Sequence, residues 1–405
     1  MNSDWKQMKL IDVIQKTETV NPQKNPDSSF EYIDVSSICN KRFVIQETSI
    51  VIGKNAPSRA RKLVRTGDIL FATVRPTLKR IAQVPSYLDR QVCSTGYFVL
   101  RPKDFVEGKF LFYFLFTEHF MGAMEQLQKG ASYPAVNDGE VSSQTIYIPP
   151  LAEQKRIVTI LDEAFEGIDR AIALAEKNLA NSRELFESYL NAIFTQKGDG
   201  WVEKKLEDIC KEITVGHVGS MASKYKDSGI PFLRSQNILP FRINLDNVVF
   251  IDKEFHSTLK KSQLKPGDLA IVRTGYPGTA AVIPDELEIV NCSDLVIVKP
   301  GQNINPHYLS LFFNSVFGKA LVGSRLVGAA QKHFNITTAK KVLIPFPCLT
   351  EQNSLVTKID ELAAETQRLE SIYRQKLAAL KELKQSMLQK AFTGELTADT
   401  VEKAA

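Results

Sequence analysis

The stretch LAEQKRIVTILDE at residues 151–163 decides the fold, because it returns as LTEQNSLVTKIDE at residues 349–361. The two copies stand 198 positions apart (349 minus 151) and share a Glu-Gln pair, a Val-Thr pair and a closing Asp-Glu pair. The same offset relates the Phe-Thr pair at 194–195 to the one at 392–393. A repeat of this length indicates a duplicated architecture. The chain of 405 residues is therefore predicted to contain two copies of one structural unit.

The segments that precede the two copies repeat the same landmarks in the same order. KLIDV, TGDIL and CSTGYFVLRP in the first correspond to KLEDI, PGDLA and CSDLVIVKP in the second. Each segment then has an aromatic helical stretch, a glycine-led loop and a short apolar strand that ends in proline. The pattern predicts an α+β fold in which two similar globular modules are each followed by a long helix. The expected boundaries are a first module at 1–150, a first long helix at 151–196, a second module at 197–348, a second long helix at 349–396 and a tail at 397–405.

The two helical copies resemble each other more closely than the two modules do. This difference is expected if the helices share one mechanical role while the modules bind two different targets. We therefore look for binding residues in the modules and for packing residues in the helices.

Both helical segments are predicted to be long and amphipathic. Each has a Glu in its first turn, where a carboxylate suits the positive end of the helix dipole, and apolar residues recur every three or four positions. At about 1.5 Å per residue each helix would be roughly 65 Å long, more than one module can cover. We therefore expect the helices to pack on each other as a coiled coil with imperfect heptads. The residues expected to form this packing are Ile157, Leu161, Ile168, Leu179, Leu355, Ile359, Leu362, Leu369 and Leu377.

An amphipathic stripe alone is also typical of an ordinary core helix. Length separates the two interpretations, because two helices of this size carry more apolar surface than they can cover for each other. Part of that surface is expected to bind the helices of another protein.

The excess positive charge lies in the modules. Residues 1–150 contain 19 basic and 15 acidic residues, and residues 197–348 contain 19 and 14. The first helix has 5 basic against 8 acidic residues, and the chain from 349 has 8 against 9. Basic modules joined by acidic helices favour a nucleic-acid partner for the modules.

The basic residues of the modules stand among Tyr, Gln and Asn on turns that follow predicted strands. This arrangement suits phosphate contacts combined with hydrogen bonds to base edges, although any single member is also compatible with an ordinary exposed side chain. The candidates for DNA binding in the first module are Arg59, Arg61, Arg75, Lys79, Arg80, Tyr133 and Asn137. Those in the second module are Arg234, Gln236, Asn237, Arg273, Tyr276, Lys332 and His333.

Several classes of protein are disfavoured by what the sequence lacks. The amino-terminal residues do not have the pattern of a secretory signal, and the densest apolar run, FLFYFLF at 110–116, is much shorter than the roughly 20 residues of a membrane span. Five scattered cysteines without a CxxC pair favour a reducing cytoplasm over a disulfide framework. The five dispersed histidines give no support for a metal site.

Catalytic signatures are also missing from the sequence. There is no phosphate-binding loop, no dinucleotide-binding glycine pattern and no Asn/Asp-Pro-Pro-aromatic motif of an adenine methyltransferase. GHVGS at 216–220 is too short a glycine pattern to indicate a phosphate site. We therefore expect a binding protein with no catalytic residues and no cofactor of its own.

The chain resembles the DNA-specificity subunits of Type I restriction-modification enzymes. The resemblance rests on IPPLAEQKRIVTILDE and FPCLTEQNSLVTKIDE, on the Gly-Asp turn in each module and on QKAFTGEL near the end, and it covers essentially the whole chain. Cys348 stands where the first copy has its second proline, a difference that concerns only the start of the second helix.

The resemblance implies two target recognition domains that each read one half of a split sequence in double-stranded DNA, held apart by two antiparallel helices. It also implies two methyltransferase partners that use S-adenosylmethionine and two restriction subunits that use ATP and Mg²⁺. Direct repeats joined by antiparallel helices would be related by a pseudo-twofold axis, as the strands of B-DNA are. A separation of about 34–36 Å, one turn of DNA, would let both modules enter the major groove from one side.

Two other classes of function are compatible with parts of the sequence. A coiled-coil scaffold that assembles proteins without binding DNA would need the helices but not the basic modules. A free-standing methyltransferase would need the motifs that the sequence lacks.

Overall fold

The computed structural model describes residues 5–326 and 333–398. Two compact units are present: one comprises Met1–Ala175 and Gln375–Ala405, and the other comprises Glu176–Arg374. Each unit therefore contains one module and one half of each long helix. The long helices are α5 (Leu151–Gln196) and α11 (Leu349–Thr393).

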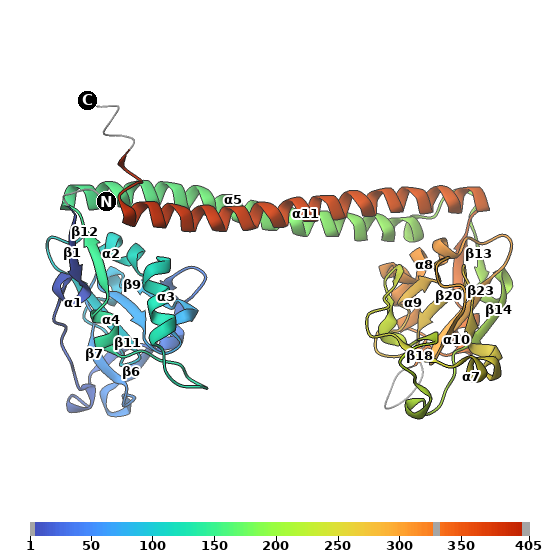
Figure 1. The fold of residues 1–405 in the computed structure, drawn as a ribbon, viewed down its shortest axis with the longest axis horizontal. Coiled ribbons are helices and arrows are strands. Elements are labelled where there is room, and N and C mark those ends of the chain that lie inside the picture. The colour runs from blue at the N-terminus through green and yellow to red at the C-terminus, as the bar shows by residue number, and fades with distance from the viewer. Residues whose placement is uncertain (1–4, 327–332, 399–405) are drawn as a thin grey trace. The chain divides into compact units, whose positions relative to one another are not determined.

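The first module is built on two four-stranded sheets and four short helices (Figure 1). One sheet has the order β2 (Ile14–Gln15), β11 (Tyr97–Pro102), β8 (Ile69–Ala72) and β9 (Ile81–Gln83). The other has the order β6 (Ser49–Ile52), β3 (Ser29–Ile33), β10 (Val92–Ser94) and β7 (Ala60–Leu63). Two-stranded pairs join β1 (Lys6–Lys9) to β12 (Thr145–Ile148) and β4 (Ile38–Cys39) to β5 (Val44–Ile45). The helices are α1 (Leu10–Val13), α2 (Gly108–Phe114), α3 (Glu118–Leu127) and α4 (Asp138–Ser142).

The second module repeats this topology strand for strand. Its first sheet has the order β14 (Cys210–Val215), β23 (Leu295–Pro300), β20 (Leu269–Val272) and β21 (Ala280–Val282). Its second has the order β18 (Val249–Ile251), β15 (Ile230–Leu233), β22 (Val290–Cys292) and β19 (Gln263–Leu264). The pairs are β13 (Val202–Lys205) with β24 (Leu343–Phe346) and β16 (Ile238–Leu239) with β17 (Arg242–Ile243). The helices are α6 (Leu206–Ile209), α7 (Lys253–Thr258), α8 (Pro306–Asn314), α9 (Val316–Gly323) and α10 (Ile336–Lys340).

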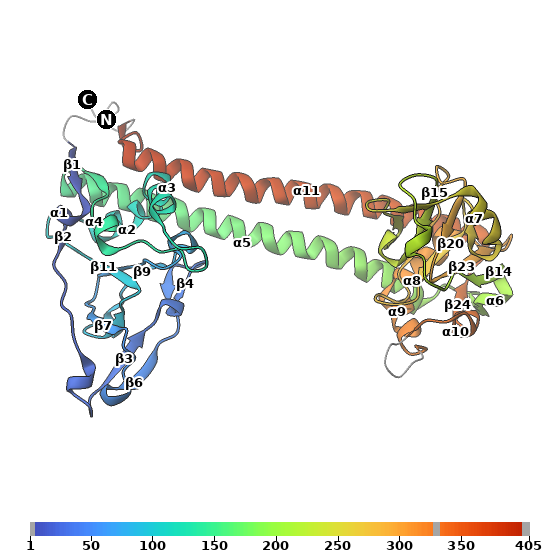
Figure 2. The same ribbon diagram turned by 60° about the horizontal axis from the view of Figure 1, so that its bottom comes forward.

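The first sheet of each module is buried on both faces, which explains its continuous apolar strands. In β8, Ile69 and Phe71 belong to a core formed with the helices, while Leu70 and Ala72 face a second core shared with the other sheet. Figure 2 shows β11 of this sheet between α2 and the strands β3 and β6. In β20 the residues of LAIV divide between two cores in the same alternating way.

The Gly-Asp turn before each central strand has a structural role. Gly67 and Gly267 have φ values of 86° and 83°, a conformation that glycine adopts without strain. Asp68 then accepts a hydrogen bond from the backbone N–H of Arg65 at 2.8 Å, and Asp268 accepts one from that of Lys265 at 2.9 Å. The repeated Gly-Asp pair is thus explained by the turn that leads into β8 and β20.

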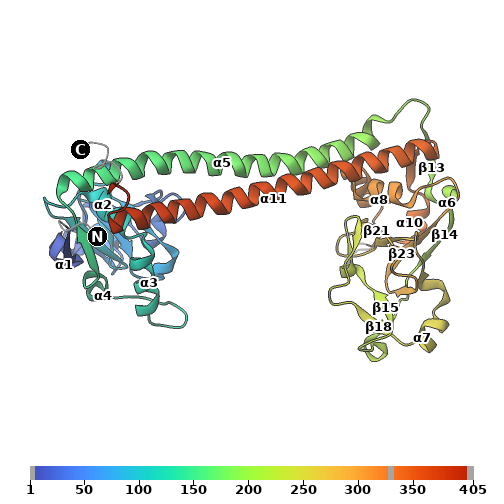
Figure 3. The same ribbon diagram turned by 45° about the horizontal axis from the view of Figure 1, so that its top comes forward.

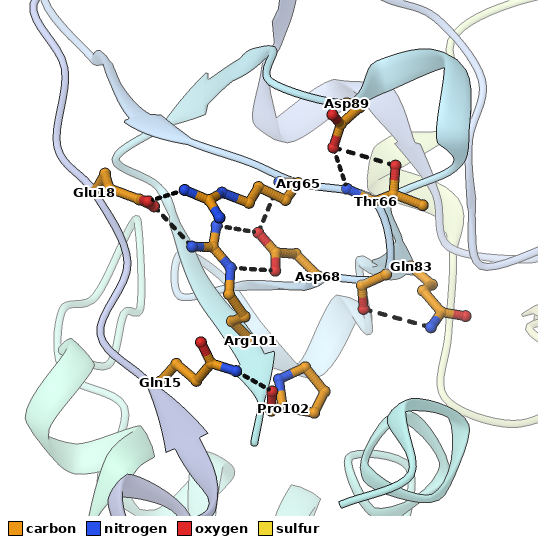
Figure 4. A network of polar contacts seen from close by, with 10 residues as sticks. Gln15, Glu18, Arg65, Thr66, Asp68, Gln83, Asp89, Arg101 and Pro102 are labelled. Carbon is orange, nitrogen blue, oxygen red and sulfur yellow. Dashed lines mark hydrogen bonds and ion pairs between the residues drawn. The ribbon is translucent and has the colours of Figure 1, made fainter. Parts of the chain in front are cut away.

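The surroundings of the two aspartates differ between the modules. Figure 4 shows the Arg101 guanidinium between Asp68 and Glu18, with two hydrogen bonds of 2.8 Å to Asp68 and one of 2.7 Å to Glu18. The second module has Lys299 at the corresponding place, and this side chain bonds Glu212 at 2.6 Å. Burial raises the pKa of Asp268, because the hydrogen bond from the Lys265 N–H and the charges of Lys299 and Lys265 offset only part of its desolvation.

A buried glutamine fixes the start of each long helix to its module. The Gln154 side chain accepts from the Glu107 N–H at 2.8 Å and donates to the carbonyls of Phe105 and Pro149 at 3.0 and 2.9 Å. In the second copy Gln352 repeats all three bonds, with the Asn305 N–H at 2.9 Å and the carbonyls of Asn303 and Pro347 at 3.1 and 2.9 Å. Both glutamines are 0% exposed. These bonds give a physical reason for the Gln in the repeated Leu-x-Glu-Gln motif.

The far end of each helix is held by the repeated Phe-Thr pair. Phe392, near the end of α11, lies 4.7 Å from the Phe110 ring and 5.7 Å from the Phe114 ring of α2. Phe194, near the end of α5, lies 5.5 Å from the Tyr308 ring and 5.4 Å from the Phe312 ring of α8. Each long helix therefore begins on the module that precedes it and ends in the core of the other unit.

The halves of α5 and α11 that share a unit pack side by side (Figures 1 and 3). In the first unit Lys384 bonds both carboxylate oxygens of Asp169, at 2.7 and 3.0 Å. In the second unit Arg183 makes a bidentate pair with Glu370, at 2.8 and 3.0 Å. From the first pair to the second, the residue number rises along α5 and falls along α11. The helices therefore run antiparallel, and the predicted α+β fold with two paired helices is confirmed.

The residues predicted to pack between the helices fall into two groups. Ile157, Leu161 and Ile168 are buried in the core that also holds α2, α3 and Leu388 of α11, and Ile359 is buried in the corresponding core of the second unit. The ends of the helices thus pack on the modules as well as on each other. The remaining five, Leu179, Leu355, Leu362, Leu369 and Leu377, are half-buried. The second helix ends at Thr393 rather than at 396, because Gly394 follows with φ 85°.

The glutamine anchor leads to a test of stability. Replacing Gln154 by Ala should leave one buried and two part-buried backbone groups without their side-chain partner and destabilise the first unit by about 2–4 kcal/mol. Hydrogen exchange followed by mass spectrometry should show faster exchange in residues 103–115. The control is Lys155→Ala, one position along the same helix and exposed. Unchanged exchange in Gln154→Ala would mean that the anchor contributes nothing.

Candidate nucleic-acid interface

Three of the residues predicted to bind DNA come together at one edge of the first module. The turn after β10 connects them: the Thr95 N–H donates to the Arg59 carbonyl at 2.8 Å, and the Thr73 N–H donates to the Gly96 carbonyl at 2.9 Å. Thr73 leads from β8 to Arg75, whose N–H donates to the Pro134 carbonyl at 2.7 Å. Arg59, Arg75 and Tyr133 are exposed at this edge.

Arg75 is positioned there by an uncommon backbone conformation and by an aromatic ring. Its φ of 51° lies in the left-handed region, which a residue other than glycine adopts only where its surroundings hold it. The guanidinium carbon lies 4.7 Å from the Tyr133 ring, and Nη2 donates to the Ser132 carbonyl at 3.1 Å. The side chain remains exposed and offers donors in a planar fork that suits a phosphate or a guanine.

The corresponding edge of the second module encloses a polar cavity of about 630 Å³. Arg273 follows β20 there, and its Nη1 donates to Asp294 at 2.6 Å while its Nε donates to the Phe334 carbonyl at 3.3 Å. The lining residues are His217, Val218, Gly219, Arg273, Ser293, Asp294, His333 and Asn335. Imidazoles, a carboxylate and a guanidinium in one cavity provide both donors and acceptors for hydrogen bonds.

Gly216 allows the backbone at this cavity to pack closely. A Cβ on this residue would lie 2.8 Å from the Cys292 sulfur and 3.0 Å from the Asp294 nitrogen. With glycine there, the His217 N–H donates to the Cys292 carbonyl at 2.8 Å, and the Asp294 N–H donates to the His217 carbonyl at 3.1 Å. GHVGS therefore forms part of the cavity wall, a role that the sequence did not indicate.

Several predicted DNA-binding residues make hydrogen bonds within the protein. Asn237 is fully buried, accepts from the Arg234 N–H at 3.0 Å and donates to the Asn244 carbonyl at 2.9 Å, so it offers no surface to DNA. Arg80 donates to the carbonyls of Val35 and Ile38 at 3.0 and 3.3 Å. Asn137 caps α4 by accepting from the Glu140 N–H at 2.8 Å.

The other predicted residues occupy varied places. Arg61 donates to Asn21 at 2.9 Å, and Arg234 donates to the Asn247 carbonyl at 2.8 Å. Lys79 lines a separate cavity that also involves α5 and α11. Gln236 and Tyr276 are exposed, with Tyr276 at 84%. Lys332 lies outside the described residues, while His333 lines the polar cavity.

Sequence reasoning missed His217, Ser293, Asp294 and Asn335 as members of the polar cavity. The one available signal was the divergence of the repeated landmark, which reads CSTG in the first module and CSDL in the second. That divergence places Asp294 where the first module has a Thr-Gly turn. A carboxylate was not expected in a site sought through basic residues.

In the described part of the chain, no three His, Cys, Asp or Glu side chains are grouped closely enough to hold a metal ion. No helix in that part of the chain is long and apolar enough to cross a membrane.

Comparisons with known proteins agree with this architecture. The model of the Type I restriction modification DNA specificity domain matches residues 2–178 and 198–379. The chain is 25% identical over 406 residues to the EcoKI specificity subunit of Escherichia coli K12, covering 95% of this chain and 86% of that one. The HsdS subunit from Thermoanaerobacter tengcongensis is 28% identical, with a TM-score of 0.70 over 98% of each chain. A chain from a study of complex assembly and conformational transition of the type I R-M system is also 28% identical, with a TM-score of 0.84 over 98% of this chain and 99% of that one.

Two equivalent modules with different polar edges, joined by a pair of antiparallel helices, define a DNA-specificity subunit. This chain belongs to the Type I restriction modification DNA specificity family. It is the non-catalytic specificity subunit of such an enzyme, the subunit that recognises DNA, as the resemblance implied.

The exposed Arg75 provides a test of the first edge. Arg75→Ala should weaken DNA binding by about 1–3 kcal/mol, and the slope of binding against salt should fall by about 1 if the contact is to a phosphate. Fluorescence anisotropy over a series of salt concentrations measures both quantities. Arg170→Ala, which removes an exposed arginine from α5, is the matched control. Equal affinity and equal slope in the two variants would remove Arg75 from the interface.

Proposed function

We propose that the chain reads a split sequence in double-stranded DNA, with one half-site bound at the edge of each module. The observation that carries this proposal is that the two modules share one fold but have different polar side chains at the corresponding edge. The strand order is the same in both modules, yet one edge presents Arg75 supported by Tyr133 and the other presents the Arg273–Asp294 pair with two histidines. Two modules with different edges on a single chain are suited to a DNA site whose two half-sites differ in sequence.

The accessible members of each edge are the residues proposed to contact DNA. In the first module they are Arg59, Arg75 and Tyr133, and in the second they are Gln236, Tyr276 and His333. Arg273 supports the second edge through its ion pair with Asp294. Lys332 remains a candidate from its sequence. Single-molecule sequencing of methylated adenines in a host that expresses this chain with its partner subunits tests the proposal. It predicts one consensus made of two defined parts around an undefined spacer, and a single continuous consensus would contradict it.

Exposed apolar residues on the long helices favour two copies of one protein partner. Leu174 and Leu185 on α5 are 57% and 63% exposed, and Ile372 and Leu383 on α11 are 43% and 47% exposed. The second two stand 198 positions after the first two (372 minus 174, 383 minus 185). Each unit therefore has one such residue from each helix, and exposed apolar residues repeated in this way favour a protein contact.

We propose that two methyltransferase subunits bind these two patches, defined as Leu174 with Leu383 and Leu185 with Ile372. The partner subunits would supply S-adenosylmethionine for methylation of adenine. Two restriction subunits that use ATP and Mg²⁺ would join the same assembly. In the first unit, a cavity of about 580 Å³ is lined by aromatic residues of the module together with Lys381, Lys384 and Leu388 of α11, and it adds to the surface available for a partner.

The patches predict a change in stoichiometry. Leu174→Asp combined with Leu383→Asp should reduce the complex from two methyltransferase subunits to one, and the same changes at Leu185 and Ile372 should remove the second. Native mass spectrometry of the chain with its methyltransferase counts the subunits directly. Ser371→Asp, an exposed polar position beside Ile372, is the control. Two bound subunits in the fourfold variant would rule out these patches as the docking surface.

The helices are proposed to set the spacer between the half-sites, which gives a second test. Seven residues inserted within 168–180, after Ala175, and seven after Arg374 in α11 lengthen both helices between the two ion pairs and leave each unit's contacts in place. The added length is about 10 Å, or roughly three base pairs at 3.4 Å each. Seven residues also return the helix to nearly the same face.

The spacer in the methylated sequence should then lengthen by about three base pairs while both half-sites keep their bases. A variant that replaces the seven residues on either side of Ala175 without adding any controls for composition. An unchanged spacer in the lengthened chain would show that the helices do not set this distance.

A further inference from the structure

Corresponding arginines in the two modules differ in how exposed their side chains are and in whether they are paired with a carboxylate. Arg75 and Arg273 stand 198 positions apart, and each is joined through its backbone to the loop before α4 or α10. The Arg75 side chain is exposed and lies over Tyr133. The Arg273 side chain is only 17% exposed and is paired with Asp294, whose side chain is 41% exposed. At the edge of the second module, the carboxylate is therefore the more accessible partner.

The Asp294 carboxylate is held in place from several sides. Arg273 Nη1 bonds one oxygen at 2.6 Å, and the Thr274 hydroxyl bonds the other at 3.4 Å. The backbone of Asp294 has φ 51° and is tied to the His217 carbonyl at 3.1 Å. A carboxylate fixed in this way keeps lone pairs for an external donor, because an ionised carboxylate can accept about four hydrogen bonds.

The polar cavity next to Asp294 contains a group that no described residue satisfies. His333 Nδ1 is buried and has no hydrogen-bond partner among the described residues. Buried polar atoms of native proteins are nearly always paired, so this atom at the cavity wall can take a partner from outside the described residues, such as a bound molecule or water. His217, Ser293 and Asn335 add further polar atoms around the same space of about 630 Å³.

We propose that Asp294, positioned by Arg273, is a specificity-determining residue that accepts a hydrogen bond from the N4 amino group of a cytosine in the half-site of the second module. In the major groove, guanine presents only acceptors and thymine presents an acceptor beside a methyl group, so both repel a carboxylate. Adenine has an amino donor, but its N7 acceptor lies beside it and faces the same carboxylate. Cytosine presents the amino donor without such an acceptor.

This assignment rests on the proposed split recognition and goes further by naming the base type and the residue that reads it. Arg273 acts here as a positioning residue, since its guanidinium is turned toward Asp294 and the Phe334 carbonyl. The two edges consequently differ in sign: the first offers a cation to DNA and the second offers a carboxylate.

The test uses two substitutions that fit the left-handed backbone at 294. Asp294→Asn keeps the shape and removes the charge, and Asp294→Gly removes the side chain; both residue types tolerate a φ near 50°. Each variant is expressed with the methyltransferase partner, and methylated adenines are sequenced alongside the wild type and Arg75→Ala. The Arg75→Ala variant alters the half-site of the first module and so identifies the other half-site as that of the second.

The expected result is a loss of discrimination at one G·C position of the second half-site by about 5- to 100-fold, with the first half-site unchanged. Two results would overturn the assignment: a wild-type second half-site without any G·C pair, or a second half-site that both Asp294 variants recognise as the wild type does. Thermal melting followed by circular dichroism distinguishes a variant that has lost its fold from one that has lost base recognition. A variant that melts at a lower temperature than the wild type is not used to judge DNA recognition. The assignment is then judged by whether the wild-type second half-site contains a G·C pair.

Failure of the proposed function has a different signature. If the wild-type chain directs methylation at a sequence without two separate parts, split recognition itself is wrong. If the site is split and Asp294 variants leave it unaltered, split recognition holds and only the role of Asp294 is wrong.

Discussion

A buried glutamine amide at the start of each long helix is the contact on which the rest of the structure depends. Gln154 and Gln352 each use one acceptor and two donor hydrogens to join the helix to the loop before α2 or α8 and to the proline that ends the module. Because the amide itself is removed from water, losing its bond to Pro149 or Pro347 would leave a buried carbonyl unpaired. The direction in which each helix leaves its module is therefore fixed by hydrogen bonds that hydrophobic packing alone could not specify.

The aromatic residues near the C-terminal ends of the long helices determine which chain segments make up each unit. Phe392 packs on α2, which belongs to the first module, and Phe194 packs on α8, which belongs to the second. Each unit is consequently assembled from its module, the first half of that module's own helix and the second half of the other helix. Such an arrangement couples chain segments that are far apart in sequence. It also explains why the Phe-Thr pair recurs at the same offset as the Glu-Gln pair, since both belong to one repeated contact scheme.

The two modules show how one scaffold supports different binding chemistry. The double-faced burial of the first sheet is the same in both, and so are the Gly-Asp turns that introduce β8 and β20. The loops at the edge place Val136 and Phe334 in these cores, while their exposed side chains can change without loss of the fold. At this edge the first module has an exposed arginine on a tyrosine, whereas the second has an arginine neutralised by a carboxylate beside two histidines.

The sequence by itself determined the duplication, the α+β modules, the two long helices and the family, because apolar periodicity and turn residues are local signals that survive in each copy. It also singled out Arg75, which stands on the exposed turn after the central strand β8, and Tyr133 in the loop before α4. Only the tertiary structure decided that Arg80 bonds the carbonyls of Val35 and Ile38, and that Asp294 and His217 join Arg273 and His333 in one cavity. The physical reason is that the partner of a polar side chain comes from segments dozens of residues away. Whether that side chain faces water or is satisfied within the protein is fixed only when those segments meet.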